Sequence, residues 1–158
     1  MNTVTTTISI QGEINAVFDL LTTTRLWTQW HPTTTGVGGV TERPFQLGDI
    51  VRERAQIGSR IHEGNWTVSE HTRPHHARLH MPAAHNARLI ITYTLVEEGI
   101  MTILIRSLDY FPEDFAASVP DPNLLHKLVV NQSEQALARL KALVEAILQT
   151  ETNLTIAE

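Results

Sequence analysis

Apolar and polar residues alternate along the start of the chain, which predicts a β-strand. In "TVTTTISI" one face carries Val4, Thr6, Ile8 and Ile10, and the other carries only Thr and Ser. A period of two with β-branched side chains is typical of a half-buried strand. Gly12 ends the pattern. The next segment, "EINAVFDLL", places its apolar residues at helical spacing instead.

Two further segments are predicted to be helical. "TRLWTQW" forms a short helix that ends before His31 and Pro32, because the residue before a proline avoids the helical conformation. Asp121 and Pro122 are suited to the N-cap and first positions of a helix. From there an amphipathic pattern runs to about Gln149, so we expect one long C-terminal helix, followed by a flexible tail over residues 150–158.

Successive hairpins are predicted between Gly48 and Tyr110. A two-residue turn at "GS" pairs Ile57 with Arg60 and directs Glu53, His62 and Trp66 to the apolar face, which we expect to lie inside. In the next hairpin, His71 is expected opposite His76, and Val68 opposite Leu79. That register turns Ala77, Leu79 and Met81 inward, and leaves His76 and His80 outside.

The last hairpin, "ARLIITYTLV" followed by "IMTILIRSLDY", has two candidate registers. A three-residue loop "EEG" pairs Val96 with Ile100 and places Tyr93, Ile105 and Asp109 on one face. A two-residue turn "EG" places Arg106 on the face of Tyr93 instead. The three-residue loop is preferred because it suits a type I turn closed by a glycine in the left-handed region.

The element order is a strand, two short helices, six to seven antiparallel strands in all, and a long helix. This order predicts an α+β fold of a single domain over residues 1–149, in which the helix packs across a curved antiparallel sheet. The chain has 158 residues, no cysteine and a formal charge of −5. Disulfides and thiolate chemistry are thereby excluded, and nucleic acid is not an expected partner. We find no secretory signal and no apolar run of membrane-spanning length, so we expect a cytoplasmic protein that does not insert into membranes.

Three segments resemble the helix-grip superfamily (SRPBCC, START-like or Bet v 1-like proteins), and within it the polyketide cyclase/dehydrase group. They are "INAVFDLLTTTRLWTQWHP", "LGDIVRER" and "SEQALARLKALVEAIL". The resemblance extends over about residues 3 to 149. It implies a cavity between the sheet and the long helix, but it does not specify an activity, because proteins of this fold differ widely in function.

Glu53 and His62 are the candidate catalytic residues, since both are expected to point inward and could act as acid and base. The alternative is that one or both lie in water at the mouth of the cavity. Residues on the expected inner surfaces are candidate ligand contacts: Trp27, Trp30, His31, Trp66, Met81, Tyr93, Ile105, Asp109, His126, Val129 and Ser133. The tryptophans could equally be core residues, and His126 could lie on a frayed first turn of the helix.

Five of the eight histidines lie in "HTRPHHARLHMPAAH", residues 71 to 85. Imidazole is a common metal ligand, but a zinc site needs three or four convergent ligands. His71, His75 and His76 flank a proline turn, His80 is expected to point outward, and His85 lies in a further loop. We therefore expect solvated histidines here, with no metal and no other cofactor.

Three functions stay open from the sequence. The first is binding of a small hydrophobic or aromatic molecule, or a lipid, in an internal cavity. The second, implied by the resemblance, is a cyclase or dehydratase in which Glu53 and His62 transfer protons. The third is a protein-binding adaptor like the co-chaperone members of the superfamily. The sequence leaves open whether the protein is a monomer or a homodimer.

Overall fold

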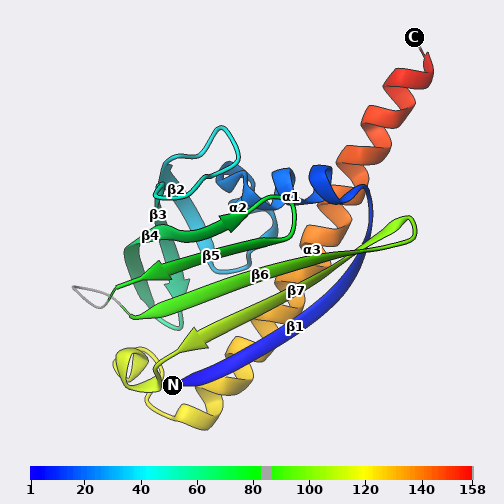
Figure 1. Ribbon diagram of the computed structural model, residues 1–158. Helices are drawn as coiled ribbons and strands as arrows, with labels where there is room; N and C mark the ends of the chain where they lie inside the picture. The colour runs from blue at the N-terminus through cyan, green and yellow to red at the C-terminus, as the bar shows by residue number, and fades with distance from the viewer. Residues whose placement is uncertain (83–86, 158) are drawn as a thin grey trace.

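Seven antiparallel strands form one curved sheet around a long C-terminal helix (Figure 1) in the computed structural model, which describes residues 1–82 and 87–157. The strand order is β1-β7-β6-β5-β4-β3-β2. This confirms the predicted α+β helix-grip fold. The strands are β1 (Asn2–Gln11), β2 (Thr34–Gly39), β3 (Ile50–Ile57), β4 (Arg60–Thr72), β5 (His76–Met81), β6 (Leu89–Glu98) and β7 (Met101–Tyr110).

Two short helical segments follow β1, as predicted. They are α1 (Ile14–Thr22), and the single-turn pieces η1 (Thr24–Leu26) and α2 (Trp27–Trp30), which run together. The side chain of Glu13 caps α1 by accepting hydrogen bonds from the backbone N–H groups of Asn15 and Ala16. A short helical turn, η2 (Pro112–Phe115), connects β7 to the last helix.

The long helix α3 (Pro122–Ala157) begins where the sequence predicts, but it extends further. Asp121 caps its start, with Oδ1 accepting from the N–H of Asn123 at 2.9 Å. The predicted end at Gln149 is wrong. No glycine or proline follows Gln149 to break the hydrogen-bond ladder, so the helix continues into solvent, with residues 150–156 exposed.

The main core lies between the concave face of the sheet and the apolar stripe of α3. Leu137, Leu140 and Val144 of the helix are buried against residues of α1 and the sheet, including Phe18 and Leu104. A smaller cluster around Tyr110 and Phe115 closes the other end of the sheet. The first half of α3 takes less part in the main core, which leaves space between it and the sheet.

The predicted β3–β4 register is confirmed, with Ile57 opposite Arg60 and Val51 opposite Trp66. The predicted β4–β5 register is confirmed at Val68 and Leu79, and the adjacent pair Thr67 and His80 follows it. A bulge between Val68 and Glu70 shifts the rest, so His76 lies opposite Thr72 rather than His71. The predicted inner residues Ala77, Leu79 and Met81 are all buried.

The preferred register of the β6–β7 hairpin is wrong. Val96 lies opposite Ile103, and a two-residue turn at Gly99 and Ile100 joins the strands. Gly99 has a φ of +61°, the conformation that a tight hairpin turn requires at its first central position. This changes the pairing by an odd number of residues, so Arg106 faces inward and Asp109 faces outward.

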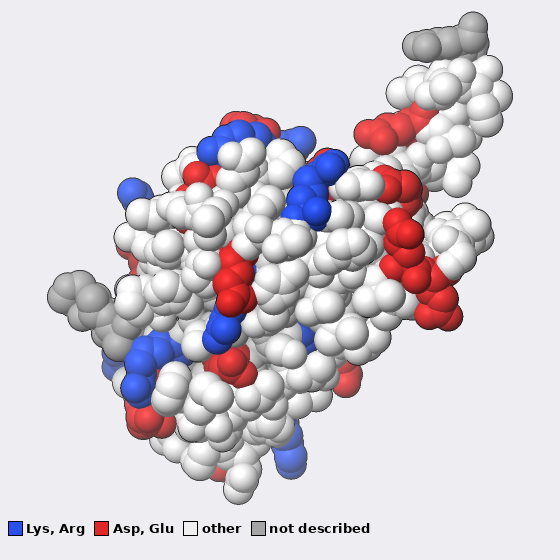
Figure 2. Space-filling model, viewed as in Figure 1, with Lys and Arg blue, Asp and Glu red and all other residues white. Residues whose placement is uncertain are grey.

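Within the described residues, no helix is both long and apolar enough to cross a bilayer. On the face shown in Figure 2, acidic and basic side chains are interspersed among uncharged residues.

Candidate functional site

A cavity lies between the concave face of the sheet, α2 and the first half of α3. Its volume, taken as the space open to the centres of water-sized spheres, is about 90 Å³. One water needs roughly 10–15 Å³ by this measure, so the cavity has room for several waters or a compact organic molecule. Most of the lining is apolar, and all three tryptophans of the chain contribute to it: Trp27, Trp30 and Trp66.

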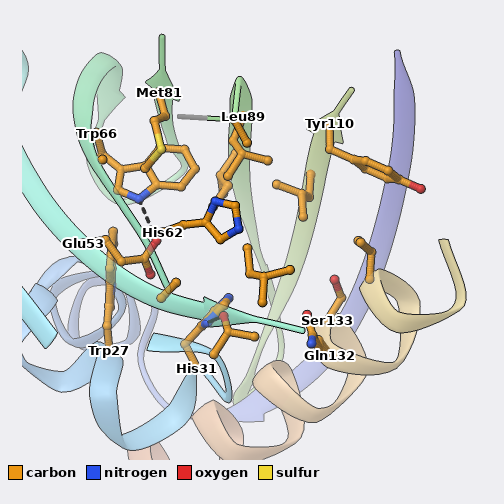
Figure 3. A pocket seen from close by; sticks show the side chains of 18 of the residues that line it. Trp27, His31, Glu53, His62, Trp66, Met81, Leu89, Tyr110, Gln132 and Ser133 are labelled. Atoms are coloured by element: carbon orange, nitrogen blue, oxygen red, sulfur yellow. Dashed lines mark hydrogen bonds between the residues drawn. The ribbon is translucent and has the colours of Figure 1, made fainter. Parts of the chain in front are cut away.

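Most of the residues predicted from the sequence lie in this lining. Those that do are Trp27, Trp30, His31, Glu53, His62, Trp66, Met81, Tyr93, Val129 and Ser133. Figure 3 shows Met81 and Leu89 on one side of the cavity, with His31, Gln132 and Ser133 on the opposite side. The site therefore has an apolar end near Met81 and a more polar end near His31.

Three predicted ligand contacts lie elsewhere. Ile105 and Asp109 fall on the opposite face of β7 because of the register correction, and Asp109 accepts a hydrogen bond from Thr3 Oγ1 at 2.6 Å. His126 is exposed on the first turns of α3, and its Nδ1 lies 2.7 Å from the hydroxyl of Tyr110. Tyr110, not His126, contributes to the cavity wall.

Glu53 is a buried carboxylate with both oxygens engaged. The indole Nε1 of Trp66 donates to Oε1 at 3.1 Å, and the hydroxyl of Thr34 donates to Oε2 in a short hydrogen bond. A buried charge is tolerable only with such partners. β3 supplies Glu53, while its partners come from the neighbouring strands β4 and β2.

His62 lines the same cavity but is not paired with Glu53. Its Nε2 lies 3.0 Å from the hydroxyl of Ser118, and its ring leans on Phe115 with ring centres 5.8 Å apart. Burial, with a smaller contribution from the charge of Arg60, lowers the pKa of His62 below its usual range. The imidazole is therefore neutral near pH 7 and able to accept a proton.

Arg106 is the main lining residue that the sequence reasoning did not select. Only 2% of it is exposed, and it lies on β7 at the polar end of the cavity. Its Nη1 donates to Ser133 Oγ at 3.2 Å, and its Nη2 donates to His31 Nε2 at 3.4 Å. Burial raises the pKa of the nearby Tyr93 hydroxyl, and the charge and hydrogen bond of Arg106 oppose this rise. Gly99, at the first position of the β6–β7 turn, is the sequence signal that could have placed Arg106 on the inner face of β7.

The tautomer of His31 follows from its partners. A guanidinium can only donate, so Nε2 of His31 must be the acceptor and Nδ1 must carry the proton. Nδ1 then donates to the hydroxyl of Thr33 at 3.0 Å or of Thr34 at 3.1 Å. Burial, together with the charge of Arg106, lowers the pKa of His31 to about 3. His31 is therefore neutral at physiological pH.

These bonds join into one chain across the cavity wall. Trp66 and Thr34 donate to Glu53, the Nδ1–H of His31 can donate to Thr34, and Arg106 donates to His31. The carboxylate and the guanidinium are thus linked indirectly, through a hydroxyl and a neutral imidazole. Such a network holds the polar side chains in one arrangement, because each hydrogen bond fixes its neighbour.

The histidine-rich stretch contributes little to this site. His76 bonds to Glu70 at 2.7 Å on the outer face, and His80 is exposed. His71 packs edge-on against Phe18, and His85 lies outside the described residues. Across residues 1–82 and 87–157, no three His, Asp or Glu side chains are grouped as metal ligands.

Residues 1–145 match the family model described as "Polyketide cyclase / dehydrase and lipid transport". No curated protein sequence matches the chain. A crystal structure of TTHA0849 from Thermus thermophilus aligns with a TM-score of 0.74 at 17% identity, over 92% of this chain and 99% of that one. A START superfamily protein from Mycobacterium smegmatis aligns at 0.64 with 16% identity, over 94% and 97%.

The di-domain ARO/CYC protein BexL, from the BE-7585A biosynthetic pathway, aligns with a TM-score of 0.65 at 14% identity. The alignment covers 89% of this chain and 49% of BexL. At these identities, the solved structures establish the shared fold and nothing further about chemistry.

Proposed function

The chain belongs to the polyketide cyclase / dehydrase and lipid transport family, and from this premise we propose that it binds a small, largely apolar molecule in the cavity beneath α3. The observation that carries the proposal is the cavity itself. It is lined mainly by aromatic and aliphatic side chains, with a few polar groups concentrated near His31. Pockets of this composition bind ligands chiefly through burial of apolar surface, and the polar groups fix the orientation.

The three tryptophans provide the measurement. Because every tryptophan of the chain lines the cavity, a ligand that enters must alter the intrinsic tryptophan fluorescence. Neutral ring compounds such as naphthalene and 2-naphthamide, and a long-chain alcohol such as 1-decanol, are suitable probes. We expect a saturable change with the ring compounds, and a weaker one with the alcohol, because the space is compact.

A matched pair of variants on β3 tests where the probe binds. Ala55 lines the cavity, whereas the adjacent Gln56 is exposed on the other face of the strand. A55L is expected to fill part of the cavity and weaken binding by about tenfold or more. The larger side chain occupies space in which the ligand would otherwise bury roughly one or two carbon atoms. Q56L should leave the affinity unchanged. The proposal fails if no probe saturates, or if the two variants bind alike.

A second candidate is proton-transfer catalysis on a bound carbonyl compound. It is favoured by one observation: His62, neutral and able to accept a proton, lines the same cavity as the carboxylate of Glu53. Their present hydrogen bonds go to other residues, so each would act separately on a substrate. Exchange of the α-protons of 2-tetralone in D₂O, followed by NMR, tests this function. Catalysed exchange should be lost in H62Q or E53Q and retained in H80Q; equal rates in all of them would rule this role out.

A further inference from the structure

Two buried N–H donors in the cavity wall have no hydrogen-bond partner within the described residues. They are Nε1 of Trp30 and Nε of Arg106. His31 lies next to both: its ring centre is 5.8 Å from that of Trp30, and its Nε2 is 3.4 Å from Arg106 Nη2. A buried donor without an acceptor is costly, and such groups are rare in folded proteins. Each donor therefore lacks an acceptor, and both belong to side chains that neighbour His31.

The charge of Arg106 is also without a direct counter-ion. None of the ion pairs among the described residues includes Arg106, so no carboxylate oxygen lies within 4.0 Å of its guanidinium nitrogens. Its partners Ser133 and Tyr93 are uncharged, and His31 is neutral. The nearest route to a carboxylate runs through His31 and Thr34 to Glu53, whose two oxygens already accept other hydrogen bonds. An isolated buried cation is unfavourable unless another group supplies negative charge.

We propose that Arg106 binds the carboxylate of an apolar acid, with the indole N–H of Trp30 as a second donor. This inference rests on the proposed function, because it assigns a chemical class to the ligand of that same cavity. A carboxylate supplies both missing elements at once, namely acceptor oxygens and a negative charge. The guanidinium is the side chain best suited to it, since it presents several donors in one plane.

The shape of the cavity gives the orientation. The carboxylate would lie at the polar end with His31 and Ser133, and the apolar body would extend toward Met81 and Leu89 (Figure 3). The carboxylate of Glu53 would repel an anionic ligand. The hydrogen bonds that it accepts from Trp66 and Thr34 stabilise its negative charge and weaken this repulsion. The expected ligand is thus a compact ring compound with one carboxylate.

Matched acid and amide probes test this inference. Benzoate and 2-naphthoate are compared with benzamide and 2-naphthamide at pH 7.5, by tryptophan fluorescence and by calorimetry. Each pair has nearly the same shape and differs in charge. We expect the acid to bind about tenfold to a hundredfold more tightly than its amide, which is the range for one hydrogen bond to a charged group. In R106Q the acid should lose this advantage, while the amide affinity changes by less than about threefold.

R52Q is the matched control, because Arg52 is exposed on the outer face of β3 and its removal changes the net charge equally. It should keep the acid preference. The side-chain Nε–H resonance of Arg106 in ¹⁵N-labelled wild-type protein is a second readout, which stands even if R106Q does not fold. It should shift with the acid and shift less with the amide.

The outcomes separate the two proposals. If no probe binds, the proposed function fails. If acid and amide bind equally, water satisfies the two donors and only this inference is overturned. An acid preference that persists in R106Q overturns it as well, because the preference then comes from another group.

Discussion

His31 couples the stability of the fold to pH, and the size of the effect can be worked out from its surroundings. Its ring lies between the hydroxyls of Thr33 and Thr34 and the guanidinium of Arg106. Burial, and secondarily the charge of Arg106, lowers the pKa of His31 to about 3 in the folded protein. Protonating Nε2 would remove the acceptor for Arg106 and place two positive charges in contact.

The sign follows from linkage. In the unfolded chain the pKa of a histidine is about 6.5, so below that pH the unfolded state binds a proton that the folded state does not. His31 therefore contributes stability that is fully present above pH 6.5 and is lost progressively as the pH falls toward 3. The slope approaches about 1.4 kcal/mol per pH unit, and the loss between pH 6.5 and pH 4 is about 3 kcal/mol.

Urea unfolding followed by circular dichroism, at half-unit steps from pH 7 to pH 4, measures this loss. In H31Q the free energy of unfolding should fall less steeply with pH than in the wild type. The difference between the two free energies should therefore change by about 3 kcal/mol over that range. H80Q, which removes an exposed histidine from the outer face of β5, should run parallel to the wild type. If H31Q also runs parallel, His31 is not held neutral. A ¹⁵N spectrum at pH 5 showing a protonated ring would refute the reasoning directly.

Three further predictions concern stability, each measured by urea unfolding at pH 7. G39A should cost about 2 kcal/mol more than G48A: both glycines have positive φ, but a Cβ at Gly39 would lie 2.5 Å from the carbonyl oxygen of Ile50, whereas Gly48 faces open space. Equal losses would mean that this contact relaxes freely. E63Q, which breaks an exposed ion pair between β3 and β4, should cost less than about 1 kcal/mol, and a larger loss would contradict the exposure of that pair. Deleting residues 151–158 should change the free energy of unfolding by less than about 0.5 kcal/mol, because residues 151–156 are exposed; a greater change would indicate packing of this end of α3.

The elements themselves were predictable because they depend on residues close together in the chain. Alternation in β1 and the helical spacing in α1 and α3 identify each segment without reference to the rest of the molecule. The inward direction of Glu53 was predictable for a similar reason, since one turn at Gly58 sets the β3–β4 register. A helix end needs a breaking signal, and its absence after Gln149 explains why α3 runs on.

The apolar pattern alone does not decide the β6–β7 register. Each face of β7 carries three apolar residues among its five positions, and the face with Leu104 and Arg106 lies inside. The turn at Gly99 sets which residues of β6 and β7 pair. A shift of this pairing by an odd number of residues exchanges the inner and outer faces of the strand. Gly58 and Gly99 have nearly the same φ, +60° and +61°, so the two hairpins use the same kind of turn. In both hairpins, a two-residue turn that begins with glycine sets the register.

The sequence by itself determined the strands, the helices, the fold class and most of the apolar cavity wall. Each of these follows from the pattern of apolar residues within a single segment of the chain. Only the tertiary structure decided the polar part of the site. Arg106 and His31 are 75 positions apart in the chain, and Thr34 and Glu53 are 19 apart. Their hydrogen bonds exist because strands of the curved sheet and α2 bring them to one end of the cavity. The same packing leaves the donors of Trp30 and Arg106 without an acceptor.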